Sequence, residues 1–248
     1  MHLRDPDARR SQQPGRLPVP MNAAFFDVDG TLTTDRVWRG LMDYFREHRL
    51  KRMTHLRFRA LHYPLYFVHR AGFISESAFR TTWAANLAWY LQGTAVTDAA
   101  PIWDWVVEQH LNRIWRADVR EILERHKLNG SLVVLVSSGP QPLIERIAVE
   151  VGADQAVGTR LETRAGRYTG RSLPPVCIDE HKAELTQQYL ADLGLPVDLV
   201  DSYAYADSAS DRQLLEMVGY PVAVYPNPAL RELALEHDWL IFPEQTSI

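Results

Sequence analysis

Two aspartates in the stretch FFDVDGTLTTD, residues 25–35, stand where they could do chemistry. Asp27 and Asp29 follow a short apolar run that is typical of a buried strand, and a two-residue step returns both side chains to the same side of an extended chain. Paired carboxylates suit either metal binding or a nucleophile with a partner acid. Gly30 follows, and a glycine there lets backbone N–H groups turn inward around an anion. Taken alone, the pair could equally be a turn or a helix cap.

Three later places carry polar side chains at the ends of predicted strands or the start of a predicted helix. Ser137 and Ser138 end an apolar run beside a helix start, an arrangement that binds phosphate. Asp207 and Asp211 form a second carboxylate pair after another strand. Lys182 opens a helix, which is unfavourable for a cation unless an anion faces it. Taken separately, the two serines could belong to an ordinary loop, Asp211 could cap a helix, and Lys182 could be a solvated lysine. Together they point to one crevice, because ligands of open parallel sheets bind at the carboxyl ends of the strands.

The elements that must position these residues alternate along the chain. Apolar stretches predict strands, and helical periodicity with a glycine at the end predicts helices with C-caps. The expected strands are 23–28, 131–138, 201–207 and 221–225, and the expected helices are 141–152, 181–194 and 211–219. This order indicates an α/β protein with a three-layer Rossmann-like core, a parallel sheet covered by helices on both faces. Residues 157–172 alternate in character around Ala165-Gly166 and predict a β-hairpin appended to the sheet.

About a hundred residues separate the first two strands, far more than a crossover connection needs. They are rich in tryptophan, arginine and leucine and have a helical pattern. We therefore expect a helical cap domain at 37–117, inserted after the first strand into a catalytic core of 21–36 and 118–248. Residues 1–20, rich in arginine and proline, predict a disordered N-terminal tail.

Composition excludes several classes of protein. A formal net charge of −4 argues against general nucleic-acid binding. Cys177 is the single cysteine, so no internal disulfide can form, and no Cys/His spacing resembles a zinc site. We recognise neither a signal peptide nor a membrane span, which favours a cytoplasmic protein.

The motifs jointly resemble a known family. DVDGTLT, a strand ending in serine, a later lysine and a strand ending in D-x-x-x-D look like the haloacid dehalogenase (HAD) superfamily of hydrolases. The inserted helical stretch, VSSG and YADSASDRQLLEMVGYPVAVYPNP are more specifically similar to its phosphoserine-phosphatase-like branch. The resemblance covers about residues 22–243.

The resemblance implies an aspartyl-phosphate mechanism with Mg²⁺ as cofactor. Asp27 would be the nucleophile and Asp29 the general acid and base. Mg²⁺ would be held by Asp27, the backbone carbonyl of Asp29, and Asp207. The double charge of the ion would offset the repulsion among these carboxylates.

The same resemblance assigns the groups around the phosphate. Ser137, with Ser138 beside it, and Lys182 would bind the phosphoryl oxygens, helped by the turn at Gly30. Asp211 would support the site by holding a metal-bound water or orienting Lys182. Of the two serines we favour Ser137, because it directly follows the strand.

We expect a phosphomonoester hydrolase that acts on a small organic or lipid-like phosphate. Dehalogenases of this superfamily do not need Asp29 or Asp207, so phosphoryl chemistry is favoured, although transfer to an acceptor other than water stays open. Phosphoserine phosphatase proper is the alternative. Those enzymes carry a glutamate nine residues after the nucleophile, where this chain has Arg36, which we expect to affect specificity; Asp35 could substitute.

The cap contains an unusual segment at 46–72, with seven Arg or Lys and one acid, Glu47, merging into an aromatic run. Such a segment could contact an anionic membrane surface or receive a lipid-like phosphate. It could also be a helix pair that packs its aromatic face inside the cap. A competing function of another class is a non-catalytic module that uses this segment to associate with membrane or RNA.

Overall fold

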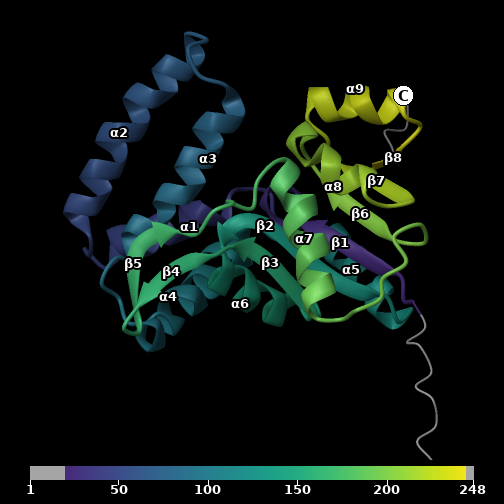
Figure 1. The fold of residues 1–248 in the computed structure, drawn as a ribbon, viewed down its shortest axis with the longest axis horizontal. Helices are drawn as coiled ribbons and strands as arrows, with labels where there is room; N and C mark the ends of the chain where they lie inside the picture. Colours follow the sequence, from purple (N-terminus) through teal and green to yellow (C-terminus); the bar gives the residue numbers. More distant parts are fainter. Residues whose placement is uncertain (1–19, 244–248) are drawn as a thin grey trace, which may run out of the picture.

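The computed structural model describes residues 20–243, so the predicted tail lies outside the described residues apart from Pro20. Two lobes are evident, one built on a sheet and one formed by helices (Figure 1). The strands are β1 (Ala23–Asp27), β2 (Leu132–Pro140), β3 (Gln155–Thr159), β4 (Leu161–Arg164), β5 (Arg167–Ser172), β6 (Tyr203–Ala206), β7 (Tyr220–Val224) and β8 (Leu240–Phe242). The helices are α1 (Val37–Glu47), α2 (Arg52–Arg70), α3 (Glu76–Asn86), α4 (Ala100–Trp105), α5 (Ala117–Leu128), α6 (Gln141–Val151), α7 (Glu180–Asp192), α8 (Arg212–Glu216) and α9 (Pro228–Glu236).

The main sheet is parallel, with six strands in the order β3-β2-β1-β6-β7-β8. Strand β1 lies between β2 and β6, and Phe26 pairs with Leu135 on one side and Tyr205 on the other. The carboxyl ends of these three strands therefore meet at one edge. The α/β prediction and its four strands are confirmed, while β3 and β8 were not predicted.

Both faces of the sheet are covered, as side chains that alternate along β1 show. Phe26 packs in a cluster with residues of α5 and α6. Phe25 points to the opposite face and packs in a cluster with residues of α7, α8 and α9. Burial of apolar side chains on both faces explains why these strands are continuous hydrophobic runs in the sequence.

The hairpin was predicted in the right region but attached to the wrong partner. Its strands β4 and β5 form a separate two-stranded sheet, and residues 155–159 belong to the main sheet as β3. The backbone of the hairpin instead bonds residues 93–96 of the helical segment. Gly93 N–H donates to Tyr168 O at 2.8 Å, and Val96 N–H donates to Gly166 O at 2.9 Å. The prediction that the hairpin is appended to the sheet was wrong, because strand alternation does not say which backbone a hairpin will pair with.

Two of the three predicted glycine C-caps are confirmed. Gly152 and Gly194 have φ of 68° and 64°, the left-handed conformation that ends a helix. Gly219 lies outside that region, so its assignment was wrong. There, an added Cβ would collide with the backbone carbonyl of Val200, and close approach is the reason for glycine.

The helical lobe consists mainly of α1 to α4, and α2 and α3 project from it side by side (Figure 1). Aromatic rings fill the space between these helices. The rings of Trp38 and Trp83 are 5.0 Å apart, and Phe58, which is buried, lies 4.9 Å from Trp83. Within residues 20–243, every helix is too short or too polar to cross a membrane.

Candidate active site

The site is built on the turn that follows β1. Asp27 ends the strand, and the chain reverses tightly over Val28–Leu32, where Thr33 N–H donates to Val28 O at 3.1 Å. Gly30 has a φ of 97°, and a Cβ there would collide with the carboxylate of Asp207. Glycine is therefore required both by the backbone conformation and by the close approach of Asp207, which follows β6.

A buried ionic cluster joins residues from three separate parts of the chain. The ammonium group of Lys182, in the first turn of α7, lies 2.6 Å from Asp27 Oδ1 and 2.6 Å from Asp211 Oδ1. Thr31 donates its hydroxyl to the other oxygen of Asp27 at 2.9 Å. All four side chains are buried. The lysine is thus held between carboxylates rather than in solvent, and Asp211 makes no helix-capping hydrogen bond with its side chain.

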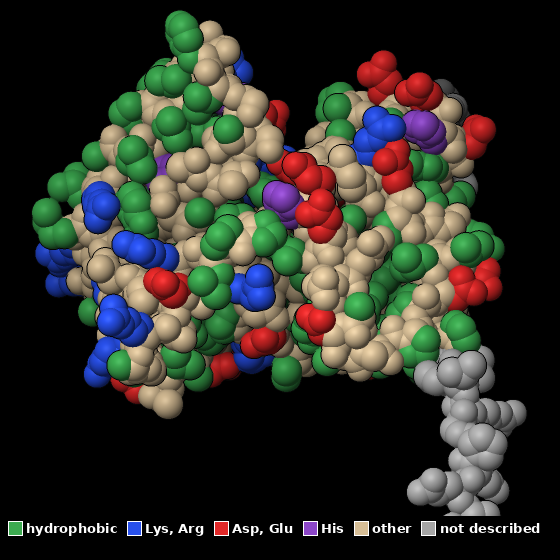
Figure 2. Space-filling model, viewed as in Figure 1, with side chains coloured by type: hydrophobic (Ala, Val, Ile, Leu, Met, Phe, Trp, Pro, Cys, Tyr) green, Lys and Arg blue, Asp and Glu red, His purple; other side chains and the backbone are tan. Residues whose placement is uncertain are grey.

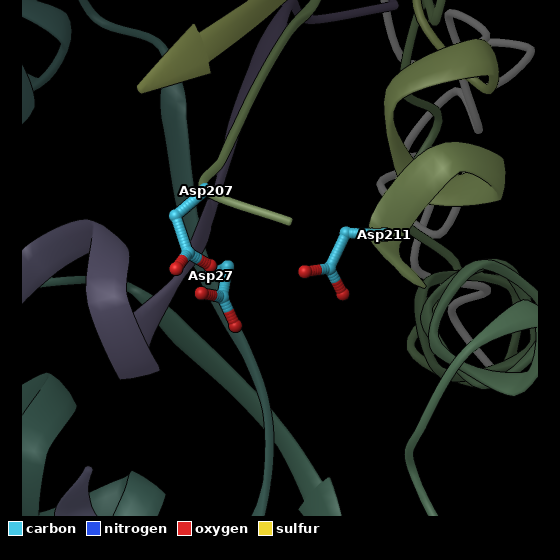
Figure 3. Close-up of side chains that lie close together, drawn as sticks. All are labelled: Asp27, Asp207 and Asp211. Carbon is cyan, nitrogen blue, oxygen red and sulfur yellow. The ribbon is translucent and has the colours of Figure 1, made fainter. Parts of the chain in front are cut away.

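Asp207 completes a set of acids suited to a divalent cation. One oxygen each of Asp27, Asp207 and Asp211 lie within 4.8 Å of one another, and Figure 3 shows Asp211 facing the other two. Oδ1 of Asp207 is buried and has no hydrogen-bond partner among the described residues. Hard oxygen ligands are those that Mg²⁺ prefers, and a buried carboxylate oxygen without a partner is costly unless a cation binds it. These residues therefore fit a magnesium ion.

Burial and neighbouring charges change the pKa of several groups in the site. Burial, and next the Asp27 carboxylate, raise the pKa of Asp29 to about 6 and that of Asp207 to about 7. Burial also raises the pKa of Asp211. Burial alone would lower the pKa of Lys182, but the Asp211 and Asp27 carboxylates outweigh it, so the pKa lies above its ordinary value. The lysine is a permanent cation at neutral pH.

Arg36 lies against the same loop. Its Nη1 donates to the backbone carbonyl of Asp29 at 2.8 Å, while the Asp29 carboxylate accepts from Val37 N–H at 2.6 Å. The carbonyl expected to hold the metal thus has a guanidinium partner. Asp35 forms an ion pair with Arg39 at 2.7 Å on the surface.

The two serines at the end of β2 lie in different surroundings. Asp27 is the register partner of Val136, so Ser137 comes directly after that pair. Ser137 is fully enclosed and its hydroxyl accepts from Gly139 N–H at 3.2 Å. Ser138 is partly exposed and lines the neighbouring cavity. Both serines therefore remain predicted phosphate ligands.

A cavity of about 470 Å³, here called the substrate cavity, lies between the strand ends and the helical lobe. Asp29, Ser138 and Arg36 contribute to its core side. Its other side is lined by aromatic residues of the helical lobe: Trp38, Tyr66, Phe79 and Trp83. Helix α3 is also linked to the core by an ion pair between Arg80 and Asp179 at 3.5 Å. The space-filling view shows the hollow between the two lobes (Figure 2).

Sequence reasoning missed three residues of this site. Thr31 is part of the DVDGTLT motif but was given no role, although its position four residues after Asp27 places a hydroxyl beside the carboxylate. Asn227 lines the substrate cavity, and its N–H donates to Asp207 O at 2.9 Å. Arg116 donates its Nε–H to Gly30 O at 3.2 Å. Nothing in the local pattern around Asn227 or Arg116 signalled these contacts.

Comparisons with known proteins agree with the geometry. The family model described as haloacid dehalogenase-like hydrolase matches residues 24–216. A phosphoserine phosphatase of Mycobacterium tuberculosis is 28% identical over 95% of this chain and 80% of its own length. A histidinol-phosphatase of Neisseria meningitidis is 27% identical over 88% of this chain and 96% of its own length.

Among solved structures, a protein of unknown function from Bordetella pertussis superposes with a TM-score of 0.76 at 26% identity, covering 90% of this chain and 98% of that one. A substrate-bound phosphoserine phosphatase shares the fold, with a TM-score of 0.56 at 20% identity, covering 90% of this chain and 93% of that one. The resemblance noted in the sequence is thereby confirmed. The chain belongs to the haloacid dehalogenase-like hydrolases, in the phosphoserine-phosphatase-like branch, and it is a phosphatase.

Proposed function

We propose that the protein is a Mg²⁺-dependent phosphomonoester hydrolase that works through an aspartyl-phosphate. The observation that carries the proposal is the placement of Lys182 between Asp27 and Asp211, with an oxygen of Asp207 nearby that has no hydrogen-bond partner within residues 20–243. Asp27, Asp207 and the carbonyl of Asp29 would hold the ion, which would supply positive charge against the phosphoryl oxygens. The carbonyl oxygen has two lone pairs, so Arg36 could keep its hydrogen bond to Asp29 while the ion binds there.

In the first step the Asp27 carboxylate attacks phosphorus, the new Oδ–P bond forms, and the bond from phosphorus to the alcohol oxygen breaks. Asp29 donates its proton to the departing oxygen. A pKa of about 6 suits this role, since part of the population is protonated near neutral pH. Lys182 stabilises negative charge on the phosphoryl group, and Ser137 or Ser138 donates a hydroxyl to it.

In the second step the ionised Asp29 takes a proton from a water molecule, whose oxygen attacks phosphorus. The bond between Asp27 and phosphorus breaks, which releases inorganic phosphate and regenerates both carboxylates in their starting states. Closure of the cap, which we propose spans 37–117, would exclude other water from the crevice.

The identity of the ester is a separate question. Two relatives of nearly equal identity are named for different substrates, phosphoserine and histidinol phosphate. Arg36 stands where phosphoserine phosphatases have a glutamate, and it bonds the Asp29 carbonyl. A guanidinium there does not favour an ammonium-bearing substrate, so we propose a small organic or lipid-like phosphate rather than phosphoserine.

The test is hydrolysis of an aryl phosphate with Mg²⁺ and with EDTA, in the wild type and in Asp27→Asn. We expect Mg²⁺-dependent release of phosphate by the wild type alone. Acid-quenched mixtures should contain phosphate covalently attached to the peptide that carries Asp27. Undiminished turnover by Asp27→Asn would contradict the mechanism.

We further propose that the outer face of α2 contacts an anionic membrane surface. Between Glu47 and Glu76 the sequence has no acid. Met53, Leu56 and Phe67 are 76%, 60% and 66% exposed on α2, and Phe73 follows at 82%. Apolar side chains cover much of this lobe in Figure 2, with Lys and Arg at its outer edge. Exposed apolar residues among cations match a surface that is negative outside and apolar beneath.

Sedimentation with vesicles tests this contact. Binding should require phosphatidylserine, weaken with salt and fall in Met53→Ser/Phe67→Ser. Equal binding to phosphatidylcholine vesicles, or binding only to RNA, would contradict it.

A further inference from the structure

The helical lobe contains a second cavity, also of about 470 Å³, which we call the cap cavity. Trp38, Tyr66, Phe79 and Trp83 line this cavity and the substrate cavity alike. The two cavities therefore adjoin across a shared cluster of aromatic rings. Each volume lies within the roughly 300–1,000 Å³ that is usual for small-molecule sites. Hydrolysis of a compact phosphate ester would need the substrate cavity alone, so the second space requires a different explanation.

The cap cavity is suited to apolar groups. Met42 and Phe58 contribute to its lining, and none of the carboxylates in the described part of the chain does. Its two histidines already have partners, since His55 Nδ1 lies 2.8 Å from the Tyr90 hydroxyl and His62 Nδ1 lies 2.8 Å from Phe58 O. Burial lowers the pKa of both imidazoles, which favours their neutral forms.

The two arginines of the cap cavity also have partners. Arg46 pairs with Asp43 at 2.6 Å, and the guanidinium of Arg59 lies over the ring of Tyr63 at 5.1 Å. These heads contact neighbouring side chains, and the Arg46 side chain is 72% exposed. The charges thus lie at the rim of a mainly aromatic space.

The substrate cavity has little unengaged charge with which to read a polar substrate. Arg36 bonds the Asp29 carbonyl, Arg39 pairs with Asp35 at 2.7 Å, and Arg80 pairs with Asp179. Glu76 lines the cavity too, but it is exposed in the first turn of α3, where the helix N-terminus already stabilises negative charge. What remains on the cap side is the aromatic cluster.

We propose that the physiological substrate is a phosphomonoester whose alcohol carries an extended apolar group, either an alkyl chain or an aromatic ring system. The phosphate binds at Lys182, and the apolar group lies against the aromatic cluster and extends into the cap cavity. This inference rests on the proposed function, because it places the phosphate at the ionic cluster.

The experiment compares soluble esters that differ in the apolar group but hardly in the acidity of the leaving alcohol. Methyl and octyl phosphate test an alkyl chain, and phenyl and 2-naphthyl phosphate test an aromatic system. Burial of each methylene is worth about fourfold in binding, so kcat/KM for octyl phosphate should exceed that for methyl phosphate by about tenfold or more. A gain confined to 2-naphthyl over phenyl phosphate would identify an aromatic substrate instead.

Two variants test whether the preference for octyl phosphate arises in the cap cavity. Met42→Trp adds an indole at a residue that lines the cap cavity alone, and it should bring the octyl-to-methyl ratio close to one. Leu235→Trp adds the same ring at an exposed position of α9 and should keep the wild-type ratio. Thermal unfolding of both variants checks that they are folded.

The outcomes separate the two proposals. Equal kcat/KM within both ester pairs would overturn the apolar-substrate inference and leave the phosphatase intact. If no ester is hydrolysed, calorimetry with methyl- and octylphosphonate, which need no turnover, still tests the cavity. Tighter binding of octylphosphonate that Met42→Trp abolishes would then support the inference while the proposed function fails. Equal binding of the two phosphonates, or none, would overturn the inference.

Discussion

The ionic cluster and the helical lobe differ in the side chains that they bury: the cluster buries charged groups, and the helical lobe buries aromatic rings. In the cluster, Lys182, Asp27 and Asp211 are buried and charged, and every charge is fixed by its neighbours. In the helical lobe, aromatic rings form the interior and the cations of α2 lie outside. Buried charge requires compensation in exact positions, whereas apolar packing tolerates many arrangements. The proposed chemistry thus depends on the exact geometry of the ionic cluster, whereas the packing of the helical lobe has no such requirement.

Among the substitutions that test this comparison, we expect the largest loss of activity from a change at Asp29. Asp29→Asn keeps the shape of the residue but removes the transferable proton. We expect kcat to fall by about 10²–10⁴, with a larger loss for alkyl than for aryl phosphates, because an alkoxide needs protonation more. Steady-state kinetics with both classes checks this, and an equal loss for the two would argue against proton donation by Asp29.

Removing the buried cation should destabilise the core. Lys182→Ala leaves Asp27 and Asp211 facing each other without compensation, which costs about 3–5 kcal/mol. Arg39→Ala breaks a pair with Asp35 in which the arginine side chain is 54% exposed, and we expect at most about 1 kcal/mol. Urea unfolding of both variants measures the difference, and similar losses would show that burial is not what matters.

The two serines can be ranked by the same reasoning. Ser137 lies beside the Asp27–Val136 pair. Ser137→Ala should remove a hydrogen bond to the charged phosphoryl group and lower kcat/KM about 10- to 100-fold. Ser138→Ala should have the smaller effect. If the order is reversed, the partly exposed serine is the ligand.

The smallest expected effect is the pH dependence of thermal stability in the absence of metal ions. The pKa values of Asp29 and Asp207, about 6 and about 7, lie above the ordinary 3.8, so the folded state holds more protons than the unfolded state between about pH 4 and 7. Their contribution to stability is therefore present at low pH and is lost as pH rises through these values. In EDTA, Tm relative to Asp207→Asn should fall from pH 5 to pH 8. Mg²⁺ should raise Tm at pH 8 for the wild type only; a relative Tm that rises with pH would contradict this.

The parallel core, and the meeting of several acidic and basic side chains at one edge of it, could be predicted because each of those residues stands next to a strand or helix whose pattern is strong. Asp27, Asp207 and Lys182 follow such patterns, and parallel topology brings their ends together. The contacts of Arg36 and Asn227 could not be predicted, because they depend on loop conformation. Nor could the aromatic cluster: Trp38, Tyr66 and Trp83 come from three helices whose crossing is set by tertiary packing. Short β3 and β8 lacked a pattern long enough to recognise.

The pairing of the β4–β5 hairpin with residues 93–96 has a consequence for any exchange of the helical lobe between related hydrolases. Residues on both sides of the second strand in sequence, some seventy positions apart, share one backbone hydrogen-bond network. An exchange of 37–117 with a related hydrolase would replace only one partner of that network. Arg167 and Ser172 of the hairpin also donate side-chain hydrogen bonds to Gly93 O and Ala85 O, each at 2.9 Å. We therefore expect a chimera that carries 161–172 from the same donor to be more stable than one that exchanges 37–117 alone.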